Sequence, residues 1–216
     1  DAATVSDARK CIRGARAFYA SRVPGQCNST LARQRSVAAD DPKATRLLEE
    51  MEAVRSSIVV QVDADGSLER FAYDIERGVM SSAEAPSYAP FMVLGHALSD
   101  FENLRRECGD SLLGFLGGLA GLGDDMRLTS SRVRSLRELA GSLAFERVGV
   151  GGFVLVAHVG VETHTSEPRA TIRINAETYA RLRAGELDPQ DAFLAGQVEL
   201  EGDEGMAIEL ALTALS

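Results

Sequence analysis

The sequence predicts an α+β protein in which helices are gathered at the N-terminus and strands and helices alternate after them. Three observations predict this class. Apolar residues recur at helical spacing over residues 1–57, β-branched and alternating segments begin at residue 58, and from there the order β-β-β-α-α-β-α occurs twice. The composition, 45% hydrophobic and 25% charged, is that of an ordinary globular chain.

The N-terminal arm, residues 1–57, is expected to be helical. Ser6 or Asp7 can cap a first helix, and Pro24 with the following glycine is expected to end it. A polar stretch comes next, and Asp41 with Pro42 then gives a second start signal, an acidic cap followed by proline at the first helical position.

Strands and helices alternate in the next segment, residues 58–143. A β-hairpin is predicted from residues 58–62 and 71–75 around an Asp-Gly turn, and a third strand near residues 91–94. Ser99 and Asp100 are expected to cap a helix, and Ser130 with Ser131 another, which would turn four side chains inward: Val133, Leu136, Leu139 and Leu143. Between these helices the glycine-rich apolar run 112–122 has 11 residues, too few to cross a bilayer.

The last segment, residues 131–216, shares the helix 131–143 with the one before it. A hairpin is predicted over residues 145–159, a strand over 170–174, helices over 176–187 and 189–195, a strand over 197–200 and a final helix over 206–215.

Residue identities support an internal duplication. Shifting the chain by 78 residues aligns residues 101–118 with 179–196, and six of the 18 positions are identical. The matches pair Leu104 with Leu182, Arg105 with Arg183, Asp110 with Asp188, Phe115 with Phe193, Leu116 with Leu194 and Gly118 with Gly196. The alternative is two unrelated α+β segments that share an enrichment in glycine and leucine.

The second half resembles the sterol carrier protein-2 (SCP2-like) domain. The shared landmarks, in order, are an alternating strand over 170–174, a helix ending at Gly185, the step Asp188-Pro189, a helix end at Phe193 and Gly196, and the turn Gly202-Asp203 before a last apolar helix. In the first half the match is weaker because the proline step is missing, so the first repeat, residues 58–143, is interpreted as a degenerate copy.

This resemblance implies a mixed sheet that is covered by helices and encloses an apolar tunnel for a lipid. The apolar positions that would line the tunnel are Tyr179, Leu182, Phe193, Leu194, Val198, Leu200, Met206, Ile208 and Leu210. The alternative is that these nine side chains fill a solid core.

Several other functions lack support in the sequence. The chain carries 23 basic and 32 acidic residues, a net charge of −9, which disfavours binding to nucleic acid. No nucleophile elbow, phosphate loop or dinucleotide fingerprint is present, and His96, His158 and His164 lack ligand spacing, so neither an enzyme nor a metal or cofactor site is expected.

Three cysteines, Cys11, Cys27 and Cys108, cannot all pair within one chain. A bridge between Cys11 and Cys27 is conceivable if the two segments of the arm run antiparallel. Cys108 lies near arginines that can lower a thiol pKa, but a single cysteine on a helix is more often inert packing.

The charge is uneven along the chain. Residues 1–39 hold seven basic against two acidic residues: Arg9, Lys10, Arg13, Arg16, Arg22, Arg33 and Arg35 against Asp1 and Asp7. This basic arm, residues 9–35, either neutralises the acidic body of the same chain or contacts an anionic surface or a protein partner. The first residue is Asp1, which is expected of a processed or trimmed chain and leaves the compartment unknown.

The function expected from these observations is non-enzymatic binding or transfer of an apolar ligand, such as a sterol, a fatty acyl lipid or an isoprenoid pigment. Two alternatives remain open. One is a scaffold subunit of a larger complex with no ligand cavity, and the other is an accessory domain of a multidomain enzyme.

Overall fold

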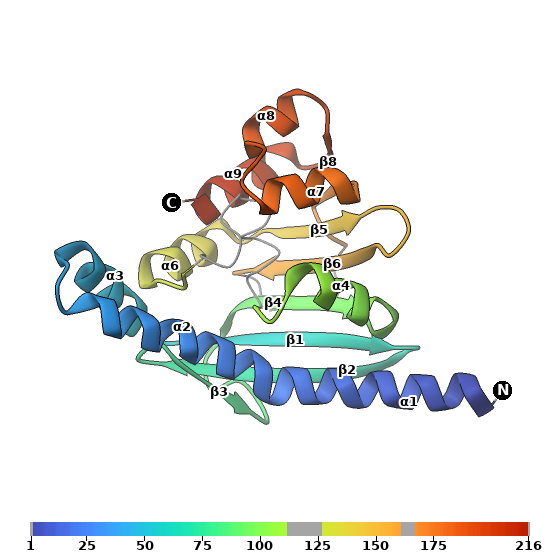
Figure 1. Ribbon diagram of the computed structural model, residues 1–216, viewed down its shortest axis with the longest axis horizontal. Helices are drawn as coiled ribbons and strands as arrows, with labels where there is room; N and C mark the ends of the chain where they lie inside the picture. The colour runs from blue at the N-terminus through green and yellow to red at the C-terminus, as the bar shows by residue number, and fades with distance from the viewer. Residues whose placement is uncertain (1, 112–126, 161–166, 216) are drawn as a thin grey trace.

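A single mixed sheet, covered by helices, organises the computed structural model (Figure 1). The model describes residues 2–111, 127–160 and 167–215. In this part of the chain the sheet has eight strands in the order β3-β2-β1-β4-β6-β5-β7-β8. The predicted α+β class with a mixed sheet and an N-terminal helical arm is therefore confirmed.

The strands of the sheet are β1 (Ser56–Ala64), β2 (Ser67–Glu76), β3 (Val79–Ala83), β4 (Pro90–Ala97), β5 (Ser142–Arg147), β6 (Phe153–Val159), β7 (Ala170–Ile174) and β8 (Val198–Gly202). The short edge strand β3 is absent from the sequence prediction, because three of its five residues are serine or alanine and give no alternating apolar signal.

The helices are α1 (Ala2–Ala17), α2 (Val23–Ala38), α3 (Pro42–Glu52), α4 (Phe101–Cys108), α6 (Ser130–Leu139), α7 (Ala176–Arg183), α8 (Pro189–Leu194) and α9 (Glu204–Leu215), with a π-turn η1 (Phe18–Arg22) and a 3-10 turn η2 (Leu98–Asp100). Figure 1 shows α1 and α2 lying across β1 and β2, α4 over the middle of the sheet and α7 over β5.

The first helix of the arm does not end at Pro24 as predicted. Helix α1 runs through the π-turn η1 directly into α2, with Pro24 near the start of α2. In the π-turn the Val23 N–H bonds the Phe18 carbonyl five residues back. This wider turn accommodates a residue that lacks an N–H and whose ring would clash with the preceding turn of a regular α-helix.

A Cys11–Cys27 bridge is excluded by the same continuity. The two residues lie 16 positions apart along one helical rod, roughly 24 Å at the helical rise, so the antiparallel arrangement that the bridge required does not form. All three cysteines are free thiols.

Some caps differ from the prediction, while Asp41 is confirmed as the N-cap of α3 through a bond from the Lys43 N–H. The N-cap of α6 is Thr129 rather than Ser130 or Ser131, and α6 ends at Leu139, so Leu143 lies in β5. Asp100 precedes α4, but its carboxylate accepts a bond from the Val154 N–H of β6 instead of capping the helix.

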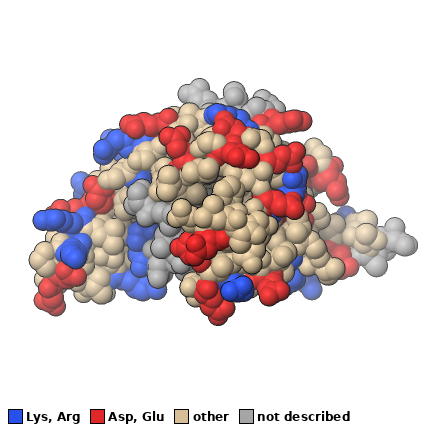
Figure 2. All heavy atoms as spheres, turned by 90° about the horizontal axis from the view of Figure 1, so that it is seen from above, with Lys and Arg blue, Asp and Glu red and all other residues tan. Residues whose placement is uncertain are grey.

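Three arginines of the basic arm pair with acidic residues of the body. The ion pairs are Arg16–Glu69, Arg22–Asp110 and Arg35–Glu52. Figure 2 shows acidic and basic side chains interspersed on the face seen from above. Contact between the arm and an anionic partner stays a prediction.

The arm is fixed to the sheet by hydrogen bonds as well as by apolar packing. The Asn28 side chain in α2 bonds the main chain of Met80 twice, donating from Nδ2 to the carbonyl (2.9 Å) and accepting from the N–H at Oδ1 (2.8 Å). Tyr73 in β2 donates its hydroxyl to the carbonyl of Tyr19 in η1 (2.6 Å). The helical rod therefore has a defined register on β2 and β3.

Some features of the sequence analysis lie outside the described residues. These are the glycine-rich run 112–122 and, within it, the first-repeat positions Phe115, Leu116 and Gly118. His164 lies outside them too. The predicted domain boundaries at residues 57, 131 and 143 stay predictions.

Replacing Asn28 by alanine should lower the free energy of unfolding by about 1–3 kcal/mol, because the part-buried N–H and carbonyl of Met80 would lose their partner. Urea denaturation followed by circular dichroism measures this change. The neighbouring exposed Ser29→Ala is the control and should stay within about 0.5 kcal/mol of the parent chain. Equal effects of the two substitutions would contradict the role of Asn28.

Candidate functional site

Four short elements at the C-terminal end of the sheet carry the nine side chains that the sequence predicts as a ligand lining. Tyr179 and Leu182 lie in α7, Phe193 and Leu194 in α8, Val198 and Leu200 in β8, and Met206, Ile208 and Leu210 in α9. The fold thus places them in neighbouring elements, but it does not bury all of them.

Four of the nine are buried between the helices and the sheet: Tyr179, Leu182, Met206 and Leu210. The Tyr179 ring lies 5.4 Å from the ring of Phe145 in β5, and its hydroxyl lies 3.6 Å from the Cys108 sulfur. Met206 lies so close to Gly141 that a Cβ there would fall 2.7 Å from its sulfur. These four side chains form an apolar layer in which Tyr179 carries a polar atom.

The two β8 residues are half-buried and face this same layer. Val198 pairs with Ile174 and Leu200 with Ile172 in the antiparallel register of β7 and β8. Glu199 and Glu201 point to the other face, where Glu201 accepts a hydrogen bond from Arg173. Alternation along the strand therefore places Val198 and Leu200 toward the helices.

The other three predicted residues are exposed: Phe193 at 38%, Ile208 at 45% and Leu194 at 73%. Helix α8 has six residues, and its buried position is Ala192. A helix this short turns one narrow face inward, so the two large side chains that follow Ala192 lie on its outer side. The sequence analysis did not predict that Ala192 is buried, because a small residue gives a weak apolar signal.

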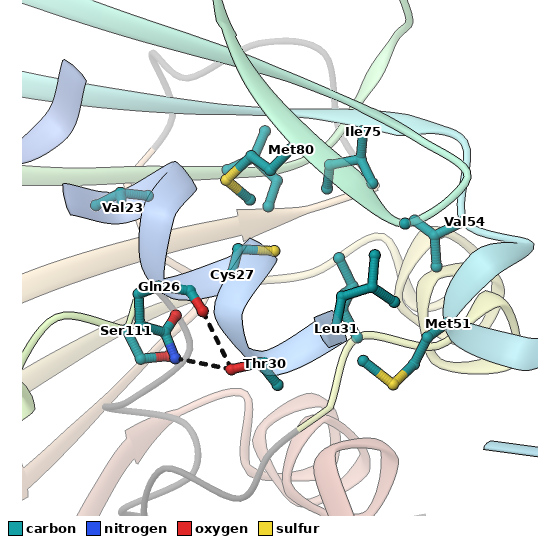
Figure 3. Close-up of a pocket in the computed structure, with 13 residues that line it drawn as sticks. Val23, Gln26, Cys27, Thr30, Leu31, Met51, Val54, Ile75, Met80 and Ser111 are labelled. Atoms are coloured by element: carbon teal, nitrogen blue, oxygen red, sulfur yellow. Dashed lines mark hydrogen bonds between the residues drawn. The ribbon is translucent and has the colours of Figure 1, made fainter. Parts of the chain in front are cut away.

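A cavity lies in the first half of the chain, between α2, α3 and the strands β1–β3 (Figure 3). Its lining includes Val23, Gln26, Cys27, Thr30, Leu31, Met51, Val54, Ile58, Ile75, Gly78, Met80, Ser111 and Leu128, and its volume is about 50 Å³. None of the nine predicted residues is among these. Sequence analysis did not indicate the cavity, because it forms where a helix of the arm meets strands 25 or more residues away.

A buried polar group lies where the arm meets β4. His96 is held by two bonds, from its Nδ1 to the Ala97 carbonyl (2.8 Å) and between its Nε2 and the Tyr19 hydroxyl (2.5 Å). Since a carbonyl can only accept, Nδ1 carries the proton and Nε2 accepts from Tyr19. Burial lowers the pKa of His96, partly offset by the Ala97 bond and by Asp100, and burial raises the pKa of Tyr19. Both groups are thus neutral and inaccessible, which suits a structural role.

Candidate metal ligands do not gather in the part of the chain that the structure describes. No three His, Cys, Asp or Glu side chains meet there as a metal-binding group. Burial raises the pKa of Cys27 to about 11, so its thiol is protonated at neutral pH. Among the described helices, none is long and apolar enough to span a bilayer.

The C-terminal part of the chain matches a known protein family. Residues 132–214, which include all nine predicted lining positions, match the model of the SCP-2 sterol transfer family. This part of the chain is an SCP2-like domain. The resemblance seen in the sequence is therefore confirmed for residues 132–214. The comparison with curated proteins found no match.

Solved sterol carrier proteins are similar to part of the chain. Sterol carrier protein 2 like 2 from Aedes aegypti is 20% identical, with 34% of this chain and 73% of that one covered and a TM-score of 0.30. Domain 2 from Helicoverpa armigera is 24% identical, with 38% and 73% covered and a TM-score of 0.30. The apo protein from Yarrowia lipolytica is 14% identical, with 48% and 94% covered and a TM-score of 0.31.

The stability of the fold should depend on the protonation of His96. Because its pKa is lowered in the folded state, the unfolded chain binds a proton more readily, and the free energy of unfolding should fall as the pH drops from 7 to 5. The slope for one proton is at most about 1.4 kcal/mol per pH unit. Urea titrations at several pH values measure it.

The matched variant is His96→Gln, which keeps a hydrogen-bonding side chain but does not titrate. It should flatten the slope between pH 7 and 5. Glu50, Glu69, Asp74 and Asp203 all have lowered pKa values, so their own contribution is lost mainly below pH 5 and does not obscure this window. An unchanged slope in the variant would show that His96 is not the titrating group.

Proposed function

We propose that this protein binds and carries an apolar ligand, a sterol, a fatty acyl lipid or an isoprenoid pigment, without catalysing a reaction on it. The observation that carries the proposal is the match of residues 132–214 to the SCP-2 sterol transfer family. The proposed binding region is the apolar layer of the SCP2-like domain, where Tyr179, Leu182, Met206 and Leu210 lie between the sheet and the helices α7 and α9.

The chemistry of this layer suits a hydrocarbon ligand. Its side chains are apolar apart from the Tyr179 hydroxyl, which faces the Cys108 thiol. Each Å² of hydrocarbon surface that a ligand buries there contributes about 25 cal/mol, so affinity would come from area rather than from polar contacts. The half-buried Val198 and Leu200 and the exposed Phe193, Leu194 and Ile208 are the proposed outer part of the lining.

Entry of a ligand would require the covering helices to move, and α9 is the element proposed to move. It is the last of the described helices and packs on α6 and β7. Its outer side exposes Ile208 and Leu212. Displacing this helix would uncover Met206 and Leu210 without breaking a strand pair of the sheet.

The same unit is proposed to occur twice, as residues 58–143 and 131–216. Strand pairing supports this: β1 pairs antiparallel with β2 and parallel with β4, and β5 pairs antiparallel with β6 and parallel with β7. Helix α3 precedes β1 and helix α6 precedes β5, and α4 and α7 follow the parallel strands β4 and β7. A shift of 78 residues aligns Val93 with Thr171. Val93 in β4 lies opposite Val59 in β1, and Thr171 in β7 lies opposite Ala144 in β5, so the two hold equivalent places.

A scaffold subunit without a ligand is the second candidate, and two surface features favour it. Leucines are exposed on the SCP2-like domain, Leu194 at 73% and Leu212 at 59%. Basic residues are exposed on α1, among them Arg9, Lys10 and Arg13. Both features would serve contact with a protein partner.

The carrier proposal predicts saturable binding of dehydroergosterol or stearate to the whole chain. In the protein labelled with ¹³C-methyl methionine, the Met206 methyl resonance should shift on binding, because Met206 lies in the proposed layer. The substitution Leu182→Trp should weaken binding at least about tenfold by overfilling that layer. The matched control is Leu212→Trp, at an exposed position outside the nine predicted residues, which should bind within about twofold of the parent.

If Leu182→Trp fails to fold, the response of the Met206 methyl resonance in the wild-type protein still tests the carrier proposal. Absence of a saturable response to both probes, with Met206 unmoved, would overturn the carrier proposal and leave the scaffold as the better candidate. An equal loss of binding in both tryptophan variants would also contradict the proposed position of the ligand.

A further inference from the structure

A cavity of about 50 Å³ lies beneath α2. We propose that it binds a short aliphatic carboxylate, with the hydrocarbon chain inside the cavity and the carboxylate beside Thr30 and Arg33. This site lies outside the SCP2-like domain and does not rest on the carrier function proposed above.

The walls of the cavity are mostly aliphatic. They are made by eight side chains from α2, α3, the strands β1–β3 and the segment before α6: Val23, Leu31, Met51, Val54, Ile58, Ile75, Met80 and Leu128. A volume of about 50 Å³ holds roughly four water-sized groups at 10–15 Å³ each. That is space for a chain of about four methylene groups, far less than a sterol requires.

The cavity cannot readily close by collapse because its walls are fixed from several sides. Asn28 holds α2 on β3 through its two bonds to Met80, and Gln34 in α2 donates to the Ala44 carbonyl in α3 (3.0 Å). The turn before β3 lies against the end of α3, where Gly78 has a φ of +78° and a Cβ would lie 2.6 Å from the Met51 carbonyl oxygen. The helices and the strands therefore keep their separation.

Polar groups gather at one side of the cavity. Figure 3 shows Gln26, Thr30 and Ser111 together, away from Ile75 and Val54. The Thr30 hydroxyl donates to the Gln26 carbonyl and accepts from the Gln26 amide, each at 3.2 Å. A ligand whose polar atom lies on this side would find both donors and acceptors.

The charge on this side favours an anion. Arg33 donates from Nη2 to the Thr30 hydroxyl (3.2 Å), which places a guanidinium group at the polar end of the lining. Asp110, next to Ser111, is already paired with Arg105 (3.0 Å) and Arg22 (3.6 Å). Asp110 is thus paired with two guanidinium groups, while Arg33 presents a third guanidinium at Thr30, and guanidinium binds carboxylates with two-pronged geometry. A carboxylate head group is therefore the better fit than an uncharged one.

Methionine methyl resonances provide the test, because the methionines report on separate regions. Met51 and Met80 line the cavity, Met206 lies in the SCP2-like domain and Met92 is buried in β4. Titrating the ¹³C-methyl-methionine protein with hexanoate should give saturable shifts at Met51 and Met80 and leave Met92 and Met206 in place. Hexan-1-ol, which has the same chain without the charge, should bind at least about tenfold more weakly.

Cysteine alkylation gives an independent readout. Cys27 lines the cavity, whereas Cys11 lies on α1 outside it. Saturating hexanoate should slow the reaction of Cys27 with N-ethylmaleimide by at least about threefold and leave that of Cys11 unchanged, as peptide mass spectrometry measures. The substitution Cys27→Leu, which fills the cavity, should weaken hexanoate binding at least about tenfold, and the matched Cys11→Leu should not.

Each contrary result overturns the proposal. Equal shifts of all four methyl groups would mean unspecific partitioning, and a shift at Met206 alone would assign hexanoate to the SCP2-like domain. Equal binding of hexan-1-ol would remove the carboxylate assignment. If Cys27→Leu does not fold, the wild-type titration and the protection of Cys27 from alkylation still test the proposed site. Neither measurement depends on whether dehydroergosterol or stearate binds near Met206.

Discussion

The antiparallel pairing of β4 with β6 is the interaction on which the rest of the structure depends. Four residue pairs in this register, from Met92 opposite Val159 to Gly95 opposite Val156, join strands of the N-terminal half to strands of the SCP2-like domain. Because the two halves share one sheet, they also share one apolar core, which extends from Tyr73 to Tyr179. A part-buried ion pair reinforces the junction, since Arg147 in β5, 4% exposed, bonds Glu107 in α4.

The shared core separates the two regions proposed to bind ligands. A side chain at the junction supports both halves, so it must pack closely. The cavity under α2 lies at one end, beside the edge strand β3. The apolar layer of the SCP2-like domain lies at the other end, beside β8. The two proposed binding regions therefore lie toward opposite ends of the sheet, under different helices.

Contact with the sheet changes the structure that the arm sequence would adopt alone. Arginines at its surface pair with acids of the body, while Tyr19 and His96 are buried together at the π-turn that lets the rod continue past Pro24. A free-standing helix of this sequence would break at proline. On the sheet, the bonds of Tyr19 and Asn28 hold the rod in place and make the wide turn acceptable.

Local pattern was enough to determine the α+β class, seven of the eight strands in the described residues, Asp41 as a cap and the resemblance to sterol carriers. Alternation, capping and the Gly and Asp-Pro steps are properties of neighbouring residues, so a single sequence shows them. The tertiary structure alone decided the continuity of the arm, the outward side of α8 that exposes Leu194, and the cavity between Cys27 and Met80. Each of these depends on which surface a residue meets across the sheet. Such contacts join segments that are far apart in the chain, so the spacing of neighbouring residues does not predict them.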